Sequence, residues 1–136
     1  MTLKELSQLY YLKKEIARDS AKLEELRAMV GCIPSPKTDG MPRSSPRVDS
    51  SAAELAADIV DLRAIISAKQ SQLLHERARL ERYINDIDDS LTRLIFAFRF
   101  IDGMDWQSVA DSIGGGNTDG SVKMTCYRYL RRHSTN

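Results

Sequence analysis

The sequence predicts an all-α protein, with an N-terminal hairpin of long, coiled-coil-like helices followed by a C-terminal domain of three short helices. In two long segments, apolar residues recur at alternating spacings of three and four, which is typical of helices that pack along a seam. A stretch containing all four prolines separates these segments. After them come short amphipathic segments that end at glycines. We therefore expect a first helix over 1–30, a flexible linker over 31–50, a long heptad helix over 51–87 and a helical domain over 88–136.

The first long segment contains neither glycine nor proline and is rich in good helix formers. Its apolar seam is interrupted only by Asp19, and Gly31 is placed where a C-capping glycine would end the helix. The linker that follows is too rich in Pro, Gly and Ser to bury a core. The seam positions of this helix are Leu9, Leu12, Ile16, Leu23, Leu26 and Val30.

The second long segment keeps one heptad register throughout, with Ser51 as its expected N-cap. Its seam is interrupted by two charged residues, Lys69 and Glu76. An intramolecular antiparallel pairing with the first helix is favoured, because a tethered partner has a high effective concentration. An intermolecular coiled coil remains open, and we expect a homo-oligomer, a dimer formed through the long helices. The seam positions are Leu55, Ile59, Leu62, Ile66, Lys69, Leu73, Glu76, Leu80, Tyr83 and Ile87.

The C-terminal domain begins at an acidic N-cap signal, Asp88-Asp89-Ser90. Its first helix is expected to end at Gly103 and to bury Leu91, Leu94, Ile95, Phe98 and Ile101, with Phe96 and Phe100 widening that face. Asp105 is the expected cap of a second helix, whose apolar residues are Trp106, Val109, Ala110 and Ile113.

The glycines Gly114 to Gly116 are expected to end the second helix, and Thr118 to cap a third. Placing Val122, Cys126, Tyr129 and Leu130 inward completes three short helices with a glycine-rich turn before the last, the pattern of a trihelical helix-turn-helix domain.

The outward side of the last helix is the candidate DNA-binding surface. From Gly120 to Asn136 the chain carries four Lys and Arg residues and no acid, although the net charge of the whole chain is only +1. Such a face is suited to a major groove, and free backbone amides at 117–119 would add a phosphate site. A basic end that merely complements the helix dipole is the plain alternative. The candidate residues are Thr118, Ser121, Lys123, Met124, Tyr127, Arg128, Arg131 and Arg132.

The stretch from Leu91 to Arg132 resembles region 4 of sigma-70-type factors. It resembles more closely the small phage and prophage regulators of the ArpU and RinA type. The motifs that carry this resemblance are Asp102-Gly103, Trp106-Gln-Ser-Val-Ala110, Gly114, Ser121-Val122 and Arg128-Tyr-Leu130.

The resemblance implies that the last helix reads promoter DNA and that RNA polymerase is a possible partner. By position it implies reading roles for Ser121, Lys123, Met124, Tyr127 and Arg128. It places Trp106, Val109, Ala110 and Val122 in the core.

Taken together, these observations favour a DNA-binding transcriptional regulator of phage or prophage type. We expect it in the cytoplasm of a bacterial host cell, with double-stranded DNA as its partner and with no cofactor, metal or membrane association. The chain has no recognisable catalytic constellation, so we do not expect an enzyme. Two alternatives remain, a small terminase subunit that recognises DNA for packaging and a coiled-coil adaptor that binds protein.

Overall fold

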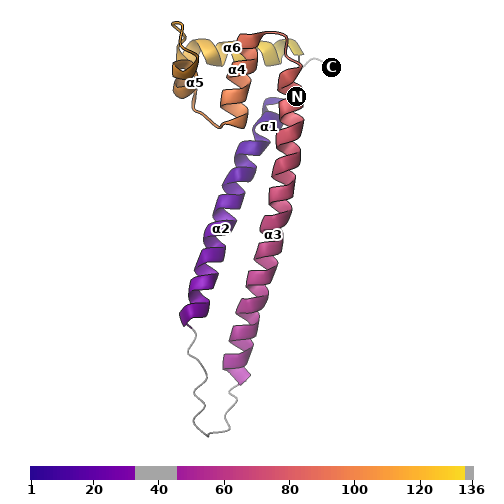
Figure 1. Ribbon diagram of the computed structural model, residues 1–136, viewed down its shortest axis with the longest axis vertical. Helices are drawn as coiled ribbons and strands as arrows, with labels where there is room; N and C mark the ends of the chain where they lie inside the picture. Colours follow the sequence, from indigo (N-terminus) through magenta and orange to yellow (C-terminus); the bar gives the residue numbers. More distant parts are fainter. Residues whose placement is uncertain (33–45, 134–136) are drawn as a thin grey trace. The chain divides into compact units, whose positions relative to one another are not determined.

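The computed structural model describes residues 1–32 and 46–133, and every regular element in these ranges is helical (Figure 1). The all-α prediction is confirmed for this part of the chain. Most of the expected linker, residues 33–45, lies outside the described residues. The elements are α1 (Leu3–Leu6), α2 (Gln8–Cys32), α3 (Pro46–Asn85), α4 (Ser90–Phe96), the π-helical turn η1 (Ala97–Ile101), α5 (Trp106–Ile113) and α6 (Asp119–His133).

The chain forms two compact units. Unit 1 combines Met1–Lys14 with Gln72–Asn136, and unit 2 comprises Glu15–Ser71. The helices α2 and α3 each contribute residues to both units.

Within unit 2, the segments of α2 and α3 run antiparallel (Figure 1). Leu23 and Ile66 are buried there, as their seam positions predict. The polar interruptions of the two seams meet: the Lys69 ammonium lies 2.6 Å from an Asp19 carboxylate oxygen and 3.4 Å from a Glu15 oxygen. The pairing with Asp19 is the main cause that raises the pKa of Lys69. Asp19 and Lys69, which each interrupt an apolar seam, therefore neutralise each other's charge within one chain.

The ends of the long helices differ from the prediction. The helix α2 continues to Cys32, so Gly31 is not a C-cap. A single glycine costs a helix about 1 kcal/mol, which neighbouring residues can offset. The helix α3 begins at Pro46, so Ser51 is not its N-cap. Proline suits a first helical turn, because its missing N–H would have no intrahelical partner there. The same helix ends at Asn85 rather than at residue 87.

The predicted heptad register of α3 matches the observed burial. Every seam position from Leu55 to Ile87 is buried or half-buried, including the charged Lys69 and Glu76. In α2 the match fails at its end, because Val30 is exposed.

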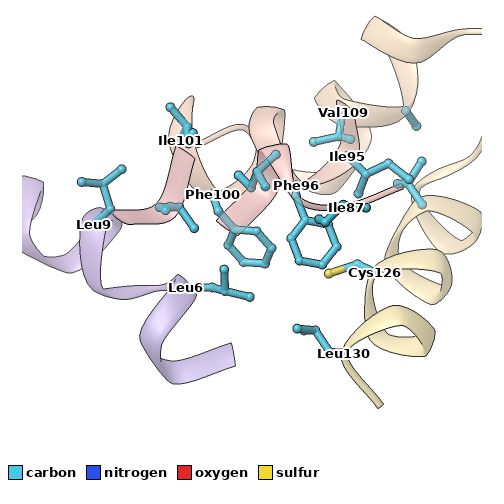
Figure 2. Close-up of a cluster of buried hydrophobic side chains, with 14 residues drawn as sticks. Leu6, Leu9, Ile87, Ile95, Phe96, Phe100, Ile101, Val109, Cys126 and Leu130 are labelled. Atoms are coloured by element: carbon cyan, nitrogen blue, oxygen red, sulfur yellow. The ribbon is translucent and has the colours of Figure 1, made fainter. Parts of the chain in front are cut away.

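A single hydrophobic cluster forms the core of unit 1 (Figure 2). Leu6, for which the sequence pattern predicted no core position, is fully buried in it. The Phe96 ring is also fully buried and lies within 5.3–6.4 Å of the rings of Phe100, Tyr129 and Tyr83. The buried members are Leu6, Leu9, Leu80, Ile84, Ile87, Ile95, Phe96, Phe100, Ile101, Val109, Ala110, Val122, Cys126 and Leu130.

The inward face of α4 is rotated from the predicted one. Leu91 and Leu94 are exposed, whereas Thr92, Ile95 and Phe96 are buried. Centring the face on Ile95 and Phe96 brings the large Phe96 ring into the core, where it buries more apolar area than either leucine would. The π-helical turn follows directly after Phe96 and carries Phe100 and Ile101 into the same cluster.

The capping signals of the short helices are confirmed. The Asp89 carboxylate accepts a hydrogen bond from the Thr92 amide at 3.0 Å, and the Asp105 carboxylate accepts one from the Ser108 amide at 2.7 Å. The Thr92 hydroxyl also donates to Asp89, at 2.7 Å, and this bond is the main cause that lowers the pKa of the Asp89 carboxyl. For the Asp105 carboxyl, whose pKa is also lowered, the main cause is the bond from the Ser108 amide. At the other ends, Gly103 and Gly114–Gly116 have positive φ, the backbone region that favours glycine.

Candidate nucleic-acid interface

The inward stripe of α6 determines which of its residues are exposed. Val122, Cys126 and Leu130 are buried and Tyr129 is half-buried, as predicted. The helix packs against α5 and also contacts α4 (Figure 1).

All eight candidate DNA-binding residues retain solvent exposure. Tyr127 is half-buried and the other seven are exposed, so the structure brings the predicted set together on one helix and its cap. They are Thr118, Ser121, Lys123, Met124, Tyr127, Arg128, Arg131 and Arg132.

The first two candidates have a structural task at the start of α6. The Thr118 hydroxyl accepts a hydrogen bond from the Ser121 amide at 3.1 Å, and the Ser121 hydroxyl accepts one from the Thr118 amide at 2.9 Å. This reciprocal pair is a capping box with serine at its third position. The spacing Thr-x-x-Ser is visible in the sequence, so the capping of α6 by these two residues could be predicted from it.

Of the backbone amides at 117–119 that were expected to hold a phosphate, those of Asn117 and Thr118 already donate within the protein. The Asn117 amide donates to the Gly114 carbonyl at 3.2 Å, and the Thr118 amide is used by Ser121. An amide that already donates within the protein cannot serve a phosphate without breaking that bond.

On the side of α6 that faces α5, aromatic and cationic side chains form a connected series. The Lys123 ammonium lies 6.0 Å from the centre of the Tyr127 ring, and that ring lies 6.2 Å from the Trp106 ring in an edge-to-face arrangement. The Arg99 guanidinium lies 4.6 Å from the Trp106 ring centre and donates to the Met104 carbonyl at 2.9 Å. Arg99 was not expected at this surface, because nothing local in the sequence marks an arginine that stacks on a residue of another element.

On the side that faces α4, Arg128 and Arg132 line a cleft of about 270 Å³. Asp89 and Thr92 line the same cleft from the start of α4. The His133 ring stacks on Tyr129 with 4.0 Å between ring centres.

Several cations in the described ranges already bind groups of the protein. Arg77 and Arg79 pair with glutamates, and Arg93 donates to backbone carbonyls. Within residues 1–32 and 46–133, Arg128 and Arg131 have no ion pair or hydrogen bond. Their guanidinium donors are therefore free to bind an external anion.

No family model, curated protein or solved structure matches this chain. No helix in the described ranges is both long and apolar enough to span a bilayer.

Proposed function

We propose that the chain is a sequence-specific DNA-binding transcriptional regulator of phage or prophage type. In this proposal α5, the glycine-rich turn and α6 form the helix-turn-helix of a sigma-70 region 4-like domain, and α6 enters the major groove. The observation that carries the proposal is the pair of free, exposed arginines, Arg128 and Arg131, on the side of α6 away from its buried stripe.

The charges around this surface support contact with phosphate. The described part of α6 after Asp119 contains no acidic residue to neutralise its four Lys and Arg side chains. Each Lys or Arg that neutralises a phosphate releases condensed counterions, so DNA affinity falls with rising salt. Arginine also matches the paired acceptors of guanine in the major groove.

The turn before α6 supports the same arrangement. Three consecutive residues with positive φ, Gly114–Gly116, turn the chain sharply after α5. Val109 and Ala110 of α5 are buried together with Val122 of α6, which holds the two helices in contact. A recognition helix needs such a rigid support because its side chains must meet base edges in one register.

The test is a salt titration of DNA binding by the full chain and by the double variant Arg128→Ala, Arg131→Ala. For DNA sequences selected by the full chain, we expect the double variant to bind about 1–3 kcal/mol more weakly for each arginine that bonds a base in the wild-type complex. We also expect a shallower dependence on salt, because two cations are missing.

The matched control is Lys22→Ala, Arg63→Ala, which removes the same charge from two exposed residues of unit 2. This control should retain wild-type affinity within about threefold, a shift below 1 kcal/mol. Equal binding by the two double variants would refute the assignment of α6 as the DNA-contacting helix.

A further inference from the structure

We infer that Lys123 and Tyr127 together bind a backbone phosphate of one DNA strand, and that neither residue reads bases. This inference rests on the proposed function and changes the role of both residues, since the resemblance implied that they read bases. It names the group that each of them contacts.

The position of the two residues around α6 is the first argument. Each residue of a helix is rotated by about 100° from the previous one. With Val122, Cys126 and Leu130 inward, Met124 lies opposite the core and is 61% exposed. Lys123 and Tyr127 lie between these two sides, on the flank that faces α5.

The contact between Tyr127 and Trp106 of α5 shows the same placement. Because the two rings lie edge to face at 6.2 Å, the Tyr127 ring is held toward α5 and is half-buried. Arg99 and its bond to the Met104 carbonyl fix the Trp106 side of this contact. A side chain held in this way cannot extend over the outermost surface of the helix.

The dimensions of the groove then separate the two kinds of contact. A helix with its side chains is about 10–12 Å across, and the major groove is about 12 Å wide. The outermost side of a helix in that groove meets the base edges, while its flanks meet the two sugar-phosphate backbones. The Lys123–Tyr127 flank therefore lies against one backbone.

The chemistry of the pair fits a phosphate. The ammonium and the phenol are both hydrogen-bond donors, and phosphate oxygens are acceptors. The Tyr127 hydroxyl makes no hydrogen bond to any residue in the described ranges. The Lys123 ammonium lies 6.0 Å from the same ring, so one anion can engage both side chains.

The experiment compares two variants of the full chain on two duplexes of equal length. One duplex is selected by the full chain from a random pool, and the other has the same composition in scrambled order. Tyr127→Phe removes one hydroxyl and retains the ring contact with Trp106. Lys123→Gln removes one charge and retains a long polar side chain.

Phosphate binding predicts that Tyr127→Phe weakens binding of both duplexes by the same factor, about tenfold. Lys123→Gln should also weaken both equally and reduce the slope of log K against log salt by about 0.9. In the control Arg63→Gln, in unit 2, we expect an unchanged slope. Unchanged melting temperatures establish that the variants fold.

The inference is overturned if Tyr127→Phe binds both duplexes like the wild type, or if it weakens only the selected duplex, because the second result means base reading. Either result leaves the proposed function standing. Absence of salt-sensitive DNA binding by the wild-type chain would instead overturn the proposed function itself.

Discussion

Cys126 lies on the inward side of α6 and is fully buried. Burial raises the pKa of its thiol to about 12, because the apolar surroundings disfavour the thiolate. Burial also raises the pKa of the hydroxyls of Tyr83 and Tyr129 in the same core. These groups retain their protons in the folded state at a pH where the unfolded chain releases them.

This difference predicts that the protein becomes less stable at alkaline pH. A raised pKa contributes stability that is fully present below the unfolded value, near 8.5–9 for a thiol, and that disappears as pH rises toward the folded value of about 12. In urea unfolding at several pH values above 9, the free energy of unfolding of Cys126→Ala should fall less steeply than that of the wild type, by up to about 1.4 kcal/mol per pH unit.

Thiol labelling gives an independent measurement of the same burial. Cys32 is exposed and should react with a thiol reagent in the native protein, whereas Cys126 should react only when the protein unfolds. Rapid labelling of Cys126 in the native protein would contradict this account. So would an equal dependence of the free energy of unfolding on pH in the wild type and in Cys126→Ala.

At the scale of the element, the contact of Lys69 with Asp19 lies within an otherwise apolar seam. The side chains of these residues are 27% and 18% exposed, so both are partly buried in the seam. Polar residues at seam positions generally reduce stability while they specify register and partner. We therefore expect this ion pair to hold α2 and α3 in their intramolecular register.

The corresponding prediction concerns the double variant Asp19→Leu, Lys69→Leu. A continuous apolar seam should raise the melting temperature, because the desolvation cost of the charges is gone. It should also allow alternative pairings, seen as additional mass in sedimentation experiments. The control Asp19→Glu, Lys69→Arg retains opposite charges and should keep the wild-type mass. A leucine variant with wild-type mass would show that the pair does not determine the partner.

At the scale of the whole molecule, residues far apart in sequence form one core in unit 1. Leu6 of α1 is fully buried with the α4–α6 residues (Figure 2). A capping box between Thr2 and Glu5 begins α1, and Arg79 lies 3.0 Å from a Glu5 oxygen. The N-terminal residues therefore support the helices that carry the candidate DNA-binding surface.

This dependence predicts that Leu6→Ala lowers the free energy of unfolding of unit 1 by about 2–5 kcal/mol. Amide hydrogen exchange in α5 and α6 should become faster, although the substitution is far from them in sequence. The neighbouring Leu3→Ala is a matched control, since Leu3 is 42% exposed and its truncation should cost within about 0.5 kcal/mol. Unchanged exchange in α6 for Leu6→Ala would contradict a shared core.

The sequence alone determined the features that depend on near neighbours. The caps Asp89 and Asp105, the glycine ends of the short helices and the inward stripe of α6 were all predictable, because capping, left-handed backbone and helical periodicity act over a few residues. The membership of the candidate site followed from that stripe.

Only the tertiary structure decided which distant residues meet. It paired Asp19 with Lys69, buried Leu6, turned Phe96 rather than Leu94 inward, and placed Arg99 on Trp106. Each of these outcomes depends on the shape and charge of a partner from another element, and this information is absent from the local pattern. The contact of Tyr127 with Trp106 of α5 likewise depends on a partner from another element. It separates the flank of α6 that carries Lys123 and Tyr127 from the outer side that carries Met124.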